Sequence, residues 1–291
     1  MIRLKLILIK LRLLRRKQLN GVSKGGEHPL WSRAGFNPRS RIQLILSLGL
    51  VLTLTRPVAA DELLVSAAAS LTNAFKSVGA EFERTHPRDK VVFNFAASDV
   101  LVKQIAEGAP VDVFASADQE VMDKAAKAKL ILASTRINFA GNRLVLAVPM
   151  DSPLRFTALE ELNGKTVRRI AISQAATVPV GRYAKAVLDK ARLWHPLQDR
   201  FIYTQNVRQT LDYLARGEVD AGFVYSTDVE LMKDRVRVAL EITTTQPVTY
   251  PIAVVAASKK VVLARQFVDL VNSPMGQTIL QKFGFIKPRS R

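Results

Sequence analysis

The 291-residue chain contains no cysteine, which excludes disulfide frameworks, thiolate nucleophiles and cysteine-ligated metals. Histidine is nearly as scarce, and His28, His86 and His195 lack the spacing of a metal site or a catalytic triad. The motifs of phosphate-binding loops, dinucleotide-binding folds, zinc proteases and serine hydrolases are also missing. The sequence therefore disfavours an enzyme, and we expect no resident cofactor.

Positive charge is abundant but unevenly placed. The formal net charge is +18, and residues 1–60 supply twelve Lys/Arg against one acid. The remaining 231 residues carry 31 Lys/Arg and 24 acids, so their net charge is only +7. These 231 residues contain no stripe of basic residues interleaved with aromatic residues, and we therefore expect no nucleic-acid partner.

Residues 1–60 are predicted to be a leader with a signal peptide. Arg39 and Arg41 precede an apolar core over residues 42–55, and small residues at 58–60 fit cleavage after Ala60. The core is shorter than the roughly 20 residues that a membrane span needs. We therefore expect a free protein in a bacterial periplasm. The first 40 residues suggest the further hypothesis that translation starts later.

From Asp61 onward, strand and helix patterns alternate. Leu71, Ala74, Phe75, Val78 and Phe82 recur at helical spacing between two apolar runs. Alternation of this kind predicts an α/β fold with mostly parallel sheets flanked by helices. The predicted strands lie at 62–67, 90–97, 111–116, 141–149, 168–173, 200–204, 221–226 and 248–258.

Four strand-to-helix junctions carry small or polar residues, around Ser70, Ser98, Val180 and Val207. Open α/β sheets bind ligands at such junctions, and the free N–H groups of helix N-termini attract anions. The plainer alternative is that Ser70 and Ser98 are helix N-caps, worth about 1 kcal/mol each. The alanines before Ser70 favour the interpretation as a ligand site, because small side chains let a ligand approach the backbone.

Three further polar residues, Tyr225, Asp112 and Asp118, lie near the ends of predicted strands. Tyr225 ends an apolar run and is either a half-buried aromatic residue or a neutral hydroxyl donor to a ligand. Asp112 and Asp118 have no base, metal or nucleophile partner in the sequence, and we interpret them as structural. Ser116 is the candidate cap of the helix that follows them.

Several segments together resemble the periplasmic molybdate-binding proteins of ABC-type importers. The resemblance spans about residues 62–287 and rests on AAASLTNAF, QIAEGAPVDVFASADQEVMD, VPVGRYAKAVL, NVRQTLDYLARGEVDAGFVYSTD and YPIAVV. It implies a two-lobed periplasmic-binding-protein fold of type II, with the ligand in the inter-lobe cleft. The lobes would comprise residues 61–139 plus 248–291, and residues 140–247.

The same resemblance implies a set of ligand-binding residues. Ser70 and Ser98 would contact molybdate through hydroxyl and backbone groups, Val180 and Val207 through backbone N–H groups, and Tyr225 through its hydroxyl. These groups would hold the metal as an oxyanion, with no direct metal-ion ligands. Asp99 departs from the expected small neutral residue, and we expect it to point to solvent or cap its helix, because an inward carboxylate would repel a dianion.

The function implied is capture of molybdate, and of tungstate, for an ABC importer. The partners would be the permease and ATPase in the inner membrane, and the protein would be a monomer. A receptor for sulfate or thiosulfate with the same fold is the first alternative. The effector-sensing domain of a transcription regulator is a more distant one, since it needs a DNA-binding helix-turn-helix and no export signal.

Overall fold

The computed structural model describes residues 62–288. The predicted signal peptide and its cleavage after Ala60 lie outside this range, as does the hypothesis of a later start. Within it, no helix combines the length and apolar character needed to cross a membrane.

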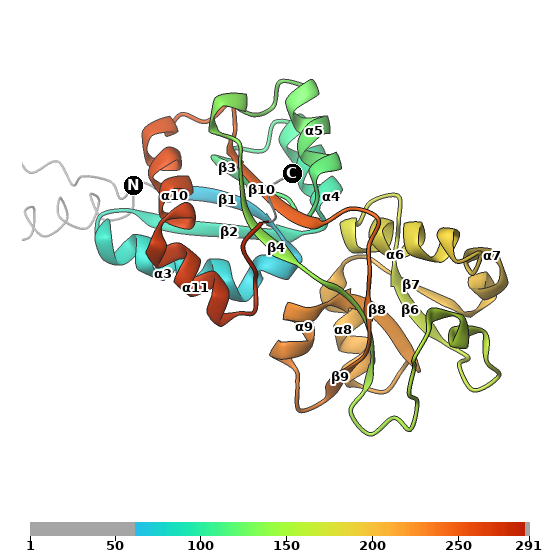
Figure 1. Cartoon of the computed structure of the whole chain (residues 1–291). Coiled ribbons are helices and arrows are strands. Elements are labelled where there is room, and N and C mark those ends of the chain that lie inside the picture. The colour runs from blue at the N-terminus through green and yellow to red at the C-terminus, as the bar shows by residue number, and fades with distance from the viewer. Residues whose placement is uncertain (1–61, 289–291) are drawn as a thin grey trace, which may run out of the picture. The chain divides into compact units, whose positions relative to one another are not determined.

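The first sheet contains five strands in the order β2-β1-β3-β10-β4 (Figure 1). β1 pairs in parallel with β2 and β3, whereas β10 is antiparallel to both of its neighbours. The strands are β1 (Glu62–Ala68), β2 (Lys90–Ala96), β3 (Val113–Ala115), β4 (Ile137–Asn142) and β10 (Val248–Val254). The helices around this sheet are η1 (Ala69–Leu71), α3 (Thr72–Thr85), α4 (Ser98–Ala106), α5 (Gln119–Lys127), η2 (Ala133–Thr135), α10 (Val261–Asn272) and α11 (Pro274–Lys282).

The second sheet repeats this plan in the order β7-β6-β8-β5-β9. β6 is parallel to β7 and β8, and β5 is antiparallel to β8 and β9. Its strands are β5 (Leu144–Pro149), β6 (Ile170–Ser173), β7 (Phe201–Thr204), β8 (Ala221–Tyr225) and β9 (Val236–Ile242). Its helices are η3 (Leu159–Asn163), α6 (Pro179–Lys190), α7 (Trp194–Leu197), η4 (Gln198–Arg200), α8 (Val207–Ala215) and α9 (Ser226–Leu231).

In each sheet one strand, β10 or β5, runs against the other four, which confirms the prediction of mostly parallel α/β sheets. The sequence did not indicate β4 or β9 as separate strands. β4 contains Asn138, Gly141 and Asn142, and β9 is a partly exposed edge strand interrupted by Arg237 and Glu241, so neither gives a strong apolar pattern.

The chain passes from the first sheet to the second at Arg143, between β4 and β5, and returns through residues 243–247, between β9 and β10. Because of these two passages, the first sheet contains segments from both sides of the second in the sequence, whereas the second sheet is built from one continuous segment, residues 144–242. The predicted lobe boundaries at 139/140 and 247/248 fall next to these passages and stay a prediction.

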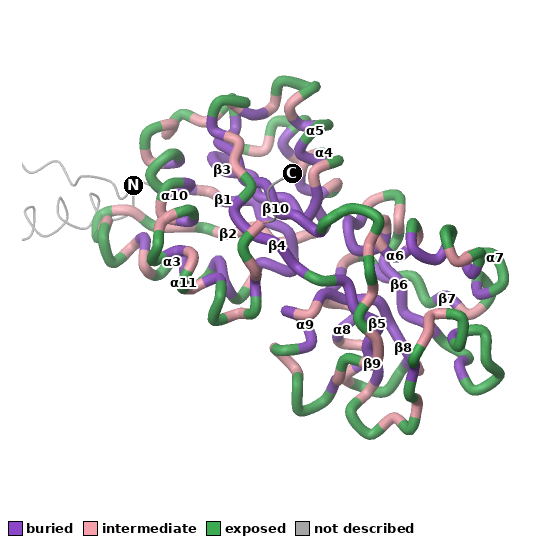
Figure 2. Tube along the Cα trace, in the orientation of Figure 1, coloured by how far each residue is buried: buried purple, intermediate pink, exposed green. Residues whose placement is uncertain are grey.

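An aromatic cluster forms the core of the first sheet's α3 face. Phe267 of α10 is fully buried, and its ring centroid lies 5.5 Å from Phe82, 6.0 Å from Phe75 and 6.3 Å from Phe93. The α3 face predicted from helical spacing is thus buried here, while the outer faces of the helices are exposed (Figure 2). A second cluster, centred on Leu101 and Phe114, lies where α4 and α5 cover the sheet.

Replacing Phe267 with alanine is expected to lower the free energy of unfolding by about 3–5 kcal/mol, because the cavity cannot be refilled by the neighbouring rings. Val262→Ala is the control on the same helix, since Val262 is 73% exposed. Urea unfolding followed by circular dichroism measures both. Equal effects of the two substitutions would contradict the placement of the core.

Candidate functional site

One small cavity gathers all five predicted site residues. Ser70 lies in η1 directly after β1, and Ser98 is the first residue of α4. From the second sheet, Val180 and Val207 lie in the first turns of α6 and α8, and Tyr225 ends β8. Its complete lining is Ala68, Ala69, Ser70, Ala96, Ala97, Ser98, Ala117, Val178, Pro179, Val180, Asn206, Val207 and Tyr225.

Neither serine caps a helix, so the alternative that they serve only as N-caps is wrong. The N-cap positions of η1, α3 and α4 are Ala68, Leu71 and Ala97, without side-chain capping bonds. Instead, the Ser98 Oγ accepts the backbone N–H of Ala117 at 3.1 Å. The Ser70 Oγ accepts the hydroxyl of Tyr250 at 3.1 Å. Each serine oxygen thus accepts a bond from the protein and keeps its own proton to donate.

The second sheet adds backbone donors. Val207 is the first residue of α8, and the side chain of its N-cap Asn206 accepts the N–H groups of Arg208 and Gln209. Val207 and Val180 both lie in the first turn, where a backbone N–H has no partner inside the helix. Their N–H groups are therefore available to a ligand in the cavity.

Gly181 sets how closely α6 approaches β6. A Cβ at this position would lie 2.2 Å from the backbone oxygen of Ser173, far inside van der Waals contact. Only glycine therefore lets the N-terminal turn of α6, with the Val180 N–H, reach the end of β6.

Tyr225 carries a buried hydroxyl with no hydrogen-bond partner among the described residues. The residue is 1% exposed, and burial, the largest cause, raises its pKa well above the usual value, so the hydroxyl stays protonated. A buried polar group of this kind normally has a partner. Because Tyr225 lies in the cavity wall, its hydroxyl can donate to an acceptor of a bound ligand.

The cavity wall contains no charged side chain, although ion pairs lie behind it. The Arg208 Nε lies 3.1 Å from Oδ1 of fully buried Asp228, and its Nη2 donates to the carbonyl oxygen of Ser70 at 3.0 Å. Burial raises the pKa of Asp228 to about 6, against the opposing influence of Arg208 and of the Tyr225 N–H. The wall therefore offers neutral donors, and the nearest cation is already paired.

The expectation that Asp99 points to solvent or caps its helix is wrong. Its carboxylate faces Arg182 of α6, with Oδ2 at 2.7 Å from Nη2, and also Lys124 at 3.1 Å. Asp118, rather than Ser116, caps α5 by accepting the N–H of Val121. The Oδ2 atom of Asp118 also lies 2.7 Å from the Arg182 Nη2, so Arg182 joins α4 and α5 to α6.

Sequence reasoning missed Arg182, although one signal could have indicated it. An arginine in the first turn of a helix opposes the helix dipole, and its presence there suggests a carboxylate partner elsewhere. The interpretation of Asp118 as structural was incomplete, because its carboxylate also binds a residue of the other sheet's helices. Asp112 is held by the Leu64 N–H and the Ser258 hydroxyl, in agreement with a structural role.

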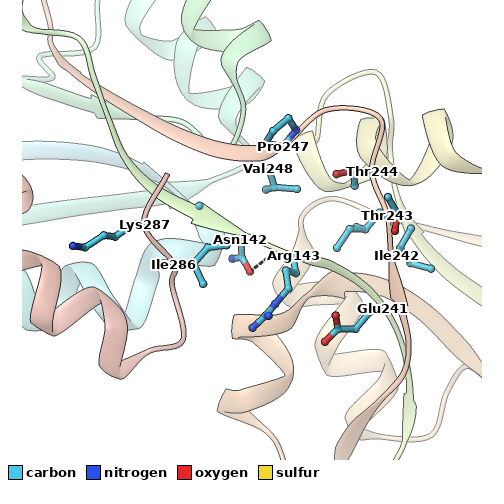
Figure 3. Close-up of a pocket in the computed structure, with 12 residues that line it drawn as sticks. Asn142, Arg143, Glu241, Ile242, Thr243, Thr244, Pro247, Val248, Ile286 and Lys287 are labelled. Atoms are coloured by element: carbon cyan, nitrogen blue, oxygen red, sulfur yellow. Dashed lines mark hydrogen bonds between the residues drawn. The ribbon is translucent and has the colours of Figure 1, made fainter. Parts of the chain in front are cut away.

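A further cavity lies where the chain passes between the sheets (Figure 3). Its lining includes Asn142, Arg143, Thr243 and Thr244 from the two passages, and none of the five predicted site residues. Among residues 62–288, no group of three or more His, Asp or Glu side chains could hold a metal ion.

Comparisons with known proteins agree with this fold. Residues 63–286 match the family model described as bacterial extracellular solute-binding protein. The molybdate-binding protein ModA of Escherichia coli is 36% identical over 238 residues, which cover 78% of this chain and 90% of that protein. ModA of Haemophilus influenzae is 32% identical, covering 78% and 91%. The chain therefore belongs to the bacterial extracellular solute-binding proteins and, within them, to the ModA family, which confirms the resemblance.

Solved structures share the two-lobed fold. The periplasmic molybdate-binding protein of Azotobacter vinelandii gives a TM-score of 0.69 at 24% identity and covers 78% of this chain and all of that one. The sulfate-binding protein SubI of Mycobacterium tuberculosis gives 0.68 at 16% identity, covering 78% and 87%. At these identities the likeness concerns the fold alone, and the anion must be argued from the cavity.

Arg182→Ala is expected to lower the free energy of unfolding by about 1–3 kcal/mol, because it leaves two largely buried carboxylates, Asp99 and Asp118, without their shared cation. Lys233→Ala is the control, since its pair with Glu230 is exposed and worth at most about 0.5 kcal/mol. Urea unfolding at pH 7 measures both. A loss for Arg182→Ala no larger than that of the control would show that the ion pairs are not formed in solution.

Proposed function

We propose that the protein captures molybdate, and tungstate, in the cavity lined by Ser70, Ser98, Val180, Val207 and Tyr225. The observation that carries the proposal is the unpartnered, buried hydroxyl of Tyr225 in a wall to which two serine hydroxyls and two helix N-termini also bring donors. Relatives named as molybdate-binding proteins, which this chain matches over nine-tenths of their length, support the choice of anion.

The chemistry of the wall favours a fully deprotonated dianion. Hydroxyl and N–H groups can donate to the oxygens of molybdate, tungstate or sulfate, none of which carries a proton. Monohydrogen phosphate brings a proton that also needs an acceptor, and leaving it unsatisfied costs about 1–3 kcal/mol. The absence of a cation from the wall also means that the anion's charge is met by dipoles alone.

Donors come from both sheets, so a bound anion joins the two lobes. Ser70 and Ser98 belong to elements of the first sheet, whereas Val180, Val207 and Tyr225 belong to the second. An anion that needs all five donors therefore stabilises the closed arrangement over an open one. Closure removes water from the anion, which strengthens each hydrogen bond to it.

The cellular role follows from the proposed ligand. We propose that the mature chain acts in the periplasm after removal of the signal peptide, as a monomer without a resident cofactor or nucleic-acid partner. It would deliver the anion to the permease and ATPase of an ABC importer in the inner membrane. The molybdate and tungstate act as cargo rather than as substrates of a reaction, and we propose no catalytic activity.

A sulfate receptor is the second candidate, because sulfate offers the same acceptors and a sulfate-binding protein shares the fold. Isothermal titration of the mature protein, residues 61–291, with molybdate, tungstate, sulfate and phosphate distinguishes the two. We expect tight binding of molybdate and tungstate and weak or absent binding of the others. Sub-micromolar binding of sulfate, without heat from molybdate, would contradict the proposal and identify the protein as a sulfate receptor.

Tyr225→Phe is expected to weaken molybdate binding by roughly 10- to 100-fold, as for a hydrogen bond to a charged group. The unfolding free energy of the ligand-free protein should not fall, because the hydroxyl has no partner there to lose. Tyr203→Phe is the control, since that ring is 44% exposed on β7. Unchanged molybdate affinity in Tyr225→Phe would remove this hydroxyl from the site.

Gly181→Ala tests the position of the Val180 N–H. The added Cβ should push the first turn of α6 away from β6 and weaken molybdate binding at least tenfold. Gly276→Ala is a matched control, because a Cβ there would lie 2.1 Å from the Leu270 oxygen, in α11 and away from the cavity. Both should destabilise the fold by about 1–3 kcal/mol. Equal affinities in the two variants would show that α6 does not supply a ligand contact.

A further inference from the structure

Asn142, the last residue of β4, has an amide whose orientation is fixed by the backbone. Its Oδ1 accepts the N–H of Arg143 at 2.9 Å (Figure 3) and the hydroxyl of Ser226 at 3.1 Å. A backbone N–H can only donate, so this end of the amide must be the oxygen. The Nδ2 group then donates to Thr227 Oγ1 at 2.9 Å and to the Tyr250 hydroxyl at 3.3 Å.

The direction of the Tyr250 hydroxyl follows from that amide. Tyr250 is fully buried in β10, and burial raises the pKa of its phenol, so the group stays protonated. Its oxygen accepts from Asn142, and its single proton is left for the Ser70 Oγ at 3.1 Å. The reverse direction would leave the Tyr250 proton facing an amide N–H, which cannot accept it.

We propose that Tyr250 is a positioning residue for the oxyanion site, which orients Ser70 so that the serine proton points away from Tyr250 and is available to the cavity. Ser70 has one hydroxyl proton, and its oxygen already accepts from Tyr250 on the side away from the cavity. The Asn142–Tyr250–Ser70 chain therefore fills one acceptor position of the Ser70 Oγ and leaves the serine proton free to be donated to a ligand. The inference rests on the proposed function for its ligand, but the hydrogen-bond chain itself does not.

Ser98 shows the same arrangement with a backbone donor. Its Oγ accepts the N–H of Ala117, which also cannot reverse. Both serines of the first sheet are thus held as donors, one by the main chain and one by a side chain. Ser70, Tyr250 and Asn142 all lie on elements of the first sheet, so Ser70 is oriented before an anion joins the lobes. A donor oriented in advance loses less freedom when the ligand binds.

Tyr250 also packs as a ring, and the test must separate this role from its hydroxyl. Its centroid lies 5.4 Å from Phe285, 5.9 Å from Tyr225 and 6.3 Å from Phe139. Tyr250→Phe keeps these contacts and removes only the oxygen. A double-mutant cycle with Ser70→Ala then shows whether the hydroxyl acts through the serine, because residues in one hydrogen-bonded chain do not contribute additively.

The experiment measures molybdate affinity by isothermal titration for the wild type, Tyr250→Phe, Ser70→Ala and the double variant. We expect Tyr250→Phe to weaken binding by about five- to tenfold, as for loss of one supporting hydrogen bond. The double variant should bind as Ser70→Ala does, within about twofold. Tyr250→Phe combined with Ser98→Ala is the control, and there the two fold-changes should multiply.

Fold-changes that multiply for Tyr250→Phe with Ser70→Ala would overturn the proposal, as would unchanged affinity in Tyr250→Phe. The same cycle is measured on the unfolding of the ligand-free protein, where the two losses should again not add. If the wild type binds none of molybdate, tungstate, sulfate and phosphate, the proposed function fails. The unfolding cycle then decides on the hydrogen-bond chain alone: losses that do not add support it, and losses that add reject it. If another of these anions binds most tightly, the binding cycle is run with that anion.

Discussion

The structure depends on a shortage of acceptors around one small cavity. Buried donors normally find partners, yet the Tyr225 hydroxyl has none among the described residues, and the serine oxygens beside it are already occupied by other donors. The first backbone N–H groups of α6 and α8 likewise have no partner inside their helices. These groups can be satisfied only by something that brings acceptors into the cavity, and this constraint supports the proposal that the ligand is a small anion.

The charged side chains near the cavity are paired with one another, and none of them lines its wall. Arg208 is paired with Asp228 behind the wall, and Arg182 is shared by Asp99 and Asp118. Had either arginine been free, a wide range of anions would be attracted whatever their protonation state. Compensated ion pairs leave selection to the direction of hydrogen bonds, which responds to the protons of the ligand as well as to its charge.

The sequence supported the α/β fold well, since its apolar runs and the α3 face are local patterns. Four of the cavity residues lie at strand-to-helix junctions and Tyr225 ends a strand, and the ends of parallel strands meet at one edge. The resemblance to a known family then implied the complete set of five. Tyr250 and Arg182 could not be found in this way. Ser70 and Tyr250 are separated by 180 residues, and Arg182 and Asp99 by 83. Such pairings depend on the return of β10 to the first sheet and on the approach of the two lobes, which no local pattern records.

The ion pairs of Arg182 bear on how long a ligand is held. Opening the lobes must hydrate the guanidinium and both carboxylates, whose side chains are only 6–17% exposed in the closed arrangement. If the proposed function holds, the lifetime of the bound state depends on this contact as well as on the donors in the wall. A change at Arg182 is then expected to alter residence time without altering which anion the wall selects.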